Sequence, residues 1–370
     1  MNHGKILAAG SAAALALGVA ACGSSNSSSS SGGSAGTGSS GGSTGPVTLN
    51  AAGSTFAAPF YQQWAANLKN QGLTLNYAAV GSGDGVAQFA QGQVAFAGSD
   101  PALTPADRAS IKKGAAVNIP TGFGAVTESY NLPGVKAGLK LDAPTSAKIF
   151  EAKITKWNDP AIAKMNPGVK LPDTKITVVH RSDSSGTTKA FTGFLASGDP
   201  NFEKSIGVDK VVNWPSGTTG AKGNAGVAAA VKQTQGAIGY VEQAYALQNK
   251  FTYASIKNSS GKFVTPTLQS VTAAGEGIKV PPDLGFSIVN SPNPAAYPVA
   301  SQTFAITYRD LCKGGVSKAD AQGVVKFLKY GLTDGQSVLK QLSYAPLPQS
   351  LDQKALAVVN GLKCDGKAIS

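Results

Sequence analysis

Histidine and cysteine are scarce in this chain of 370 residues. It contains only His3, His180, Cys22, Cys312 and Cys364. They form no CxxC pair and no Cys/His cluster, so the sequence lacks the usual ligand pattern of a zinc site. The formal net charge of +12 suits an anionic partner. Because the basic residues form no long run and do not alternate with aromatic residues, the charge argues against a nucleic-acid partner.

The first 46 residues have the pattern of a targeting segment and a spacer. Lys5 precedes an apolar run from Ile6 to Val19, which is too short for a comfortable membrane span and typical of a signal peptide, residues 1–21. Two alanines and Cys22 resemble a bacterial lipobox, which implies acyl chains such as palmitate on Cys22 and anchoring to the outer face of the cell membrane. The alternative is an ordinary signal peptide with a chance cysteine. Residues 22–46 are almost entirely Gly, Ser and Thr, which predicts a disordered tether.

From about Val47, short apolar strands alternate with turns and helices. Strands are expected at residues 47–49, 73–80, 94–98, 176–180 and 237–241. Tyr61, Trp64 and Leu68 recur at helical spacing and indicate a helix that is stopped by Gly72. This alternation predicts an α/β fold with mostly parallel strands, in which ligands bind at the carboxyl ends of the strands.

Three later stretches add detail to this organisation. Thr104 is expected to cap a helix, with Pro105 at its first position and Asp107 at its third. The proline-rich residues 281–298 are expected to cross between two lobes. Residues 317–363 have a largely helical pattern.

Three loops place small and hydroxyl residues directly before a helix. They are residues 53–56, 81–85 and 181–188. A helix N-terminus has unpaired N–H groups and a partial positive charge, and glycine lets the backbone approach a ligand, so each loop offers an anion site. The hydroxyls that add donors belong to Thr55, Ser82, Ser185 and Thr187. Any single loop has an ordinary explanation as a helix cap, but three in one chain indicate an anion-binding protein.

Three charged residues sharpen this interpretation. Arg181 offers a planar fork that suits a tetrahedral oxyanion, and Asp183 lies near enough to hold its orientation, unless the two form only a surface ion pair. Asp100 would repel an anion that has no proton to donate. Phosphate carries such a proton near neutral pH and sulfate does not, so Asp100 favours phosphate, with a turn or helix cap as the alternative role.

An enzyme interpretation would make Ser184 or Ser185 a nucleophile and His180 its base. His180 and Arg181 are neighbours on an expected strand, so their side chains point to opposite faces of the sheet. His180 would then face away from the anion. Without paired carboxylates or a metal cluster to replace it, we expect no catalysis.

Six segments carry a resemblance to a known family. They are AAGSTFAAPFYQQWA, GSGDGVAQF, FAGSDPAL, ITKWNDPAIAKMNPGVKLP, HRSDSSGTTKAF and GAIGYVEQAYA. In residues and order they resemble the phosphate-binding component of the phosphate-specific ABC transporter, and the similarity covers nearly the whole chain from about Thr48. It implies a two-lobed periplasmic-binding-protein fold of type II, the Venus-flytrap fold, with phosphate in the cleft between the lobes.

The same resemblance implies a set of ligand residues. Phosphate would be bound by Thr55 and Phe56 through the backbone, Ser82, Asp100, Arg181, Ser185, Gly186 and Thr187. Asp183 matches the partner of the arginine. Asp84 stands where the family pattern has a small residue, so an acid there either lowers the affinity or adds a contact. No cofactor and no metal is implied.

The expected lobes are residues 47–129 plus 295–370 and residues 130–294, which would close around the ligand by a hinge motion. The implied role is to bind inorganic phosphate outside the cytoplasm and deliver it to the permease subunits of an ABC importer, as a monomer. A binder of another oxyanion and a phosphate sensor without a transport role are the alternatives.

Cys312 and Cys364 remain once Cys22 is assigned to the lipid. An exported chain lies in an oxidising compartment, which makes a disulfide between them plausible, with two buried free thiols as the alternative. The disulfide would close a loop of about fifty residues and contribute up to ~4 kcal/mol in the chain-entropy model.

Overall fold

The computed structural model describes residues 45–369. The expected signal peptide, Cys22 and all but the end of the tether lie outside the described residues. Within the described part, no helix combines the length and the apolar character needed to cross a membrane.

The first half of the main sheet has the strand order β2-β1-β3-β12-β4. Strand β1 (Val47–Gly53) pairs in parallel with β2 (Leu73–Ala78) and β3 (Phe96–Ser99). Strand β12 (Ala300–Tyr308) runs antiparallel to β3 and to β4 (Ala116–Tyr130). The helical segments of this half are α1 (Ala58–Leu68), a 3₁₀ helix (Lys69–Gln71), α2 (Ser82–Gln91) and α3 (Pro105–Ser110).

The second half continues in the order β4-β8-β6-β7, and β9 (Thr252–Tyr253) also pairs with β4. Strand β6 (Thr177–Arg181) is parallel to β7 (Thr219–Ala221) and β8 (Ala237–Glu242). The helices here are α4 (Ala143–Phe150), α5 (Pro160–Met165), α6 (Gly186–Gly198), α7 (Phe202–Ser205), α8 (Gly223–Gln233), α9 (Gln243–Gln248) and α10 (Leu268–Gly275). A small separate sheet contains β5 (Lys140–Leu141), β10 (Ser255–Lys257) and β11 (Phe263–Val264).

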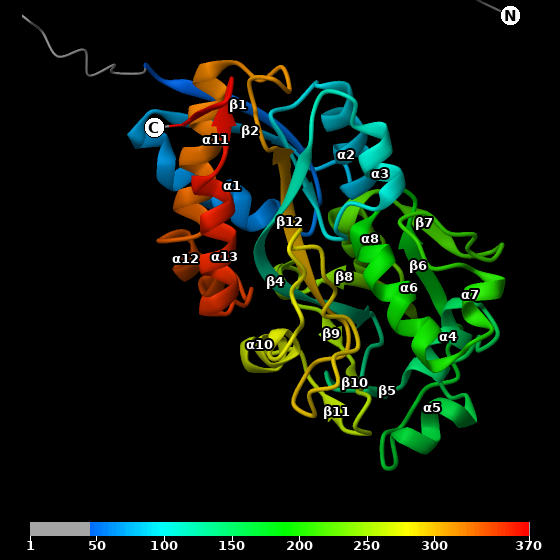
Figure 1. Cartoon of the computed structure of the whole chain (residues 1–370). Coiled ribbons are helices and arrows are strands. Elements are labelled where there is room, and N and C mark those ends of the chain that lie inside the picture. Colours follow the sequence, from blue (N-terminus) through cyan, green and yellow to red (C-terminus); the bar gives the residue numbers. More distant parts are fainter. Residues whose placement is uncertain (1–44, 370) are drawn as a thin grey trace, which may run out of the picture. The chain divides into compact units, whose positions relative to one another are not determined.

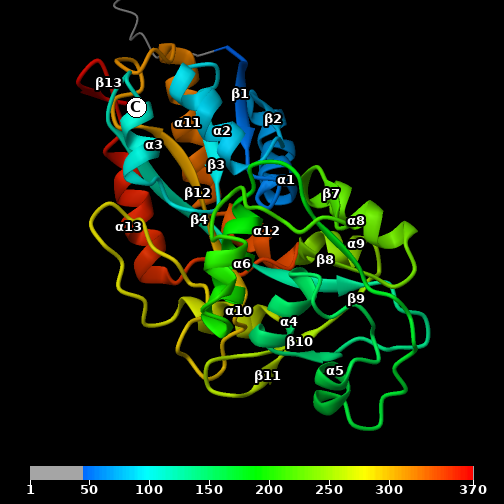
Figure 2. The same cartoon turned by 90° about the vertical axis from the view of Figure 1, so that its right-hand side faces the viewer.

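Strand β4 belongs to both halves. Its first part pairs with β12, and its last five residues, Val126–Tyr130, pair antiparallel with β8. Both views show the two long strands β4 and β12 side by side (Figures 1 and 2). The expected parallel pairing is therefore found within β2-β1-β3 and within β8-β6-β7, whereas the two long connecting strands are antiparallel. The lobe boundaries given above stay a prediction.

The C-terminal region returns to the first half of the sheet. Helix α11 (Lys318–Gly331) contacts β1 and α1, and α12 (Gly335–Gln341) also contacts α1. Helix α13 (Gln349–Asn360) and the hairpin of β13 (Lys363–Cys364) and β14 (Lys367–Ala368) complete the chain. Figure 1 shows α11 and α12 near α1, and α13 contacts α11. The expected helical tail is thus confirmed, although it consists of separate helices.

Aromatic side chains fill the core between α1 and α11. Tyr61, Trp64 and Leu68 of α1 are buried, as the helical stripe predicted, and Phe60 of the same helix is fully buried too. The rings of Tyr61 and Trp64 both lie 5.7 Å from the ring of Phe327. Burying a large apolar side chain stabilises a fold by about 1.5–3 kcal/mol. This packing therefore holds the loop at the N-terminus of α1 in place.

Helix α2 begins earlier than expected. The sequence predicted a glycine-rich loop over residues 81–85, but the helix already starts at Ser82. Gly81 supplies the turn, with φ of 107°, and a Cβ on Gly85 would overlap the backbone of β1 at Gly53. Gly85 is therefore needed for the close packing of α2 on β1. Asp84 lies exposed in the first helical turn, where an acid interacts favourably with the helix dipole.

Candidate functional site

The loop after β1 is organised by the hydroxyl of Ser54. Its oxygen accepts hydrogen bonds from the N–H groups of Phe56 at 3.0 Å and Ala57 at 3.2 Å. Its own hydrogen is donated to Asp100 Oδ1 at 2.5 Å. Ser54 thereby fixes the entry to α1 and connects it to the loop after β3.

Asp100 lies at the carboxyl end of β3 and is 2% exposed. Its Oδ1 also accepts from the hydroxyl of Thr303 at 2.9 Å, and its Oδ2 accepts from Ser82 at 3.3 Å. Burial raises the pKa of Asp100 to about 6, and the hydrogen bonds and the charge of Arg181 oppose this rise. The carboxyl group is therefore ionised at neutral pH, but its pKa is close enough to neutral that a mildly acidic pH protonates it.

Arg181 ends β6, and its side chain is 1% exposed. Its Nε and Nη2 atoms donate to the two carboxylate oxygens of Asp183 at 2.7 and 2.5 Å, in a bidentate pair. Its Nη1 atom lies 3.3 Å from Thr187 Oγ1. Asp183 also accepts from the N–H of Gly223. Burial pushes the pKa of Asp183 upward, but the hydrogen bonds and charge of Arg181 outweigh it and hold this pKa below its ordinary value.

The N-terminus of α6 follows this pair. Ser185 is the N-cap, and its hydroxyl accepts from the N–H of Thr188 at 3.0 Å. The N–H groups of Gly186 and Thr187 lie in the first turn, where no carbonyl of the helix is available to them. This end of α6 therefore offers donors and a partial positive charge to an anion.

The three loops meet around Asp100, which accepts hydrogen bonds from Ser54 and Ser82 and which the third loop approaches at Gly186. A Cβ at this position would overlap Asp100 Oδ2 and would lie 2.5 Å from Ser82 Oγ. Nearby, the N–H of Gly83 donates to the carbonyl of Ser184 at 3.0 Å. The residues expected to bind an anion are thus brought together, with one buried carboxylate beside groups that donate hydrogen bonds. Phe56 belongs to the loop of residues 53–56, and its N–H donates to the hydroxyl of Ser54.

Sequence similarity places the chain in a family. A model described as the PBP superfamily domain matches residues 29–334. The phosphate-binding protein PstS of Xylella fastidiosa (strain 9a5c) is 38% identical over 312 residues, which cover 83% of this chain and 84% of that protein. The chain belongs to the PstS family. PstS of Pasteurella multocida (strain Pm70) is 37% identical over 314 residues, 84% of this chain and 89% of the relative.

Solved structures agree with the fold of a PstS family member. A high-affinity periplasmic phosphate-binding protein bound with phosphate at pH 8.5 matches with a TM-score of 0.70 and 22% identity, over 86% of this chain and 99% of that one. A phosphate-binding protein from Stenotrophomonas maltophilia matches with a TM-score of 0.68 and 21% identity, over 87% and 99%. The two-lobed periplasmic-binding-protein fold is therefore confirmed.

Three site residues of this PstS family member were not predicted from the sequence. Ser54 and Thr303 hold the carboxylate of Asp100, and Asn224 contacts the hydroxyls of Thr55 and Thr187. Thr303 lies on a distant strand and has no local signature. Asn224 follows a glycine at the start of α8, a signal of the same kind as the three loops that were singled out.

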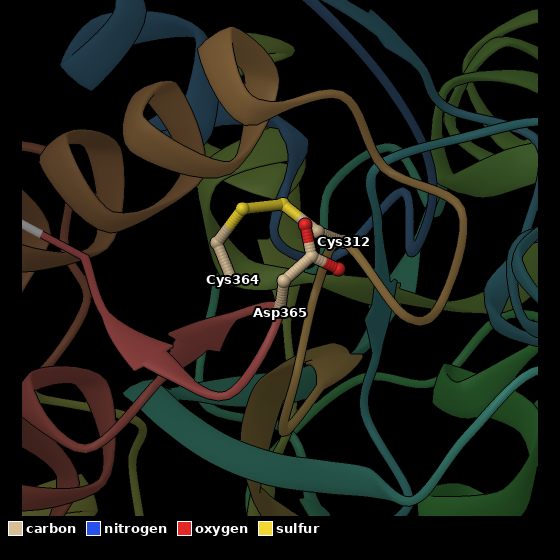
Figure 3. Close-up of side chains that lie close together, drawn as sticks. All are labelled: Cys312, Cys364 and Asp365. Atoms are coloured by element: carbon tan, nitrogen blue, oxygen red, sulfur yellow. A yellow bond between two sulfur atoms is a disulfide. The ribbon is translucent and has the colours of Figure 1, made fainter.

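One cluster in this PstS family member contains residue types that can bind metals, but its two cysteines form a disulfide. Within residues 45–369, Cys312, Cys364 and Asp365 are the one group of three such side chains that lie close together. Figure 3 shows that the two sulfur atoms are bonded to each other, while the carboxylate of Asp365 lies beside them. Because metals bind thiolates, a disulfide here is unsuited to a metal site.

Proposed function

We propose that this protein binds inorganic phosphate outside the cytoplasm and delivers it to the permease of an ABC importer. The observation that carries the proposal is the buried carboxylate of Asp100 at the point where the donor groups of three loops meet. A monoprotonated phosphate has oxygens that accept from these donors and one hydroxyl that donates to Asp100. The relatives named above are phosphate-binding proteins, which supports this assignment.

The proposed ligand set divides into donors and one acceptor. Phosphate oxygens would accept from the backbone at Thr55 and Phe56, the hydroxyls of Thr55, Ser82, Ser185 and Thr187, the N–H of Gly186 and the guanidinium of Arg181. The Ser82 hydroxyl would then turn from Asp100 to the ligand, and the N–H of Phe56 would be shared between Ser54 and the ligand. Asp183 would orient that guanidinium through the bidentate pair. Asp84 is exposed, so it would act only through long-range charge.

The protein is a binding protein and not an enzyme, as its family membership indicates. The ring of His180 stacks on Trp214, with ring centroids 5.2 Å apart, and burial lowers its pKa. The neighbouring Arg181 instead reaches Asp183 and Thr187. These contacts support the expectation that His180 has no role as a base for Ser184 or Ser185.

The proposal includes a lipid anchor on Cys22, a monomeric state and closure of the two lobes around the ligand. Cys22→Ala is expected to release the protein from the membrane fraction or to block its maturation, because the acyl chains would have no sulfur to attach to. Cell fractionation tests this, and a variant that fractionates with membranes as the unmodified protein does would contradict the anchor.

Calorimetric titration of the purified protein with phosphate, arsenate and sulfate tests the function. We expect tight binding of phosphate, similar binding of arsenate, which carries the same proton, and negligible binding of sulfate. A protein that prefers sulfate would be a binder of another oxyanion. A protein that binds phosphate, but whose deletion leaves phosphate uptake unchanged, would be a sensor.

A further inference from the structure

Asn224 lies in the first turn of α8 and is fully buried. It connects the loop after β1 with the N-terminal turn of α6. Its Nδ2 atom lies 2.8 Å from Thr55 Oγ1 and 3.3 Å from Thr187 Oγ1. Both threonines belong to the proposed ligand set, whereas Asn224 belongs to none of the three loops that the sequence singled out.

A third contact fixes the orientation of the amide. The backbone N–H of Glu242 donates to Asn224 Oδ1 at 2.9 Å. A backbone N–H only donates, so the oxygen of the amide must face Glu242. The NH₂ group of Asn224 must therefore face the two threonine hydroxyls, and both of its hydrogens are directed at them.

This orientation decides what the threonine hydroxyls do. Thr55 Oγ1 accepts from the backbone N–H of Asn224 at 3.2 Å as well as from its side chain. Thr187 Oγ1 accepts from Arg181 Nη1 and from the same side chain. A hydroxyl has two acceptor lone pairs and one hydrogen, so each oxygen has its acceptor sites filled. Within the part of the chain that the structure describes, neither hydroxyl donates its hydrogen to an acceptor.

We propose that Asn224 is a positioning residue for phosphate binding, which makes the hydroxyls of Thr55 and Thr187 obligatory donors. A hydroxyl free to rotate serves equally well as donor or acceptor, and it discriminates little between protonated and unprotonated oxygens. With both threonines held as donors, Asp100 remains the group that accepts the phosphate proton. Because the amide is neutral, this arrangement adds no charge beside the anion. The inference rests on the proposed phosphate binding.

Two substitutions at Asn224 test the proposal by phosphate calorimetry. Asn224→Ala removes the amide and is expected to raise the dissociation constant about tenfold, since the hydroxyls lose their fixed direction. Asn224→Asp keeps the shape but replaces donors by acceptors. Both hydroxyls then turn their hydrogens toward the new carboxylate, and the expected loss is about a hundredfold or more.

Asn166 offers a matched control, because it is a buried asparagine with three hydrogen bonds to backbone atoms. Asn166→Ala is expected to lower the unfolding temperature and to leave the phosphate dissociation constant unchanged. A further readout is specific to positioning. In a Thr55→Val, Thr187→Val background, Asn224→Ala is expected to have almost no additional effect on phosphate affinity, because Asn224 acts through those hydroxyls.

The outcomes separate the two proposals. If the unmodified protein binds phosphate and both Asn224 variants bind it within twofold of that value, the positioning role is wrong and the function stands. A full tenfold loss for Asn224→Ala in the double-valine background would also overturn it. Should Asn224→Asp fail to fold, the alanine variant and its double-valine comparison decide alone. If the unmodified protein does not bind phosphate, the proposed function itself falls.

Discussion

Replacing Arg181 by alanine removes the one arginine of the three loops and should affect binding and stability differently. A charge-assisted hydrogen bond contributes about 2 kcal/mol or more when its partner is otherwise left uncompensated. The phosphate dissociation constant is therefore expected to rise at least about thirtyfold. Arg181→Lys should recover part of this loss, because lysine keeps the charge but cannot offer the fork that pairs with Asp183.

The stability effect comes from the partner that remains. The side chain of Asp183 is 5% exposed, and without Arg181 its carboxylate keeps the N–H of Gly223 as a hydrogen-bond partner. Breaking a buried ion pair by removing one partner costs about 3–5 kcal/mol. Arg181→Ala should therefore also lower the free energy of unfolding in the absence of phosphate.

A second substitution separates these two effects. Adding Asp183→Asn to Arg181→Ala removes the uncompensated charge and should restore much of the stability without restoring phosphate affinity. The assays are denaturant unfolding without ligand and calorimetric titration with phosphate. An unchanged dissociation constant for Arg181→Ala would move the site elsewhere. Recovery of affinity in the double variant would show that Arg181 acts only by holding the fold.

Three further predictions concern groups around the site and in the fold. Burial raises the pKa of Glu128 to about 8, so between pH 4.5 and pH 8 the folded protein keeps a proton that the unfolded chain releases, and stability falls as the pH rises. Glu128→Gln should remove this loss of stability, which is on the order of a few kcal/mol. The measurement is the unfolding temperature against pH, and a variant with the original pH profile would refute the prediction. Lys210 in the expected second lobe pairs at 3.0 Å with Asp107 in the expected first lobe, so the pair would resist opening of the lobes. Because both side chains are partly exposed, Lys210→Met should speed phosphate release only about two- to fivefold in stopped-flow measurements. An unchanged rate would mean that the pair does not resist opening of the lobes. Cys312 and Cys364 close a loop with a sequence separation of 52, and replacing both by serine should cost up to about 4 kcal/mol in urea unfolding while phosphate affinity stays the same; unchanged stability would contradict the disulfide's role.

Features encoded by neighbouring residues could be predicted from the sequence. The capping box of α3 is an example, because Thr104 and Asp107 bond to each other's backbone over three residues. The apolar stripe of α1 and the opposite roles of His180 and Arg181 also follow from the periods of helices and strands. Local chemistry alone specifies such features, whatever the rest of the chain does.

Features that depend on distant packing could not be predicted. Thr303 reaches Asp100 across 203 residues because β12 runs antiparallel to β3, and no local pattern encodes this pairing. The early start of α2 was missed because glycine signals a turn more often than close packing against a strand, which is its role at Gly85. Ser54 was not predicted because its neighbour Thr55 carries the same hydroxyl signal, although the turn before α1 uses the hydroxyl of Ser54.

The central claim is that the protein binds phosphate and that Asp100 accepts the phosphate proton. Competition between phosphate and sulfate tests this claim most directly, because the preference for phosphate depends on the charge of Asp100. A site that requires a hydrogen bond rejects an analogue that cannot form it by ~10⁴ or more in affinity. Burial gives Asp100 a pKa of about 6, so the carboxyl group is ionised at pH 8. At this pH, calorimetry should find phosphate affinity higher than sulfate affinity by ~10⁴ or more. Asp100→Asn should shrink this gap, since an amide donates to sulfate. In the unmodified protein the gap should also narrow below pH 6, where the protonated carboxyl group can donate. Sulfate binding within about tenfold of phosphate at pH 8 would contradict both the role of Asp100 and the phosphate assignment.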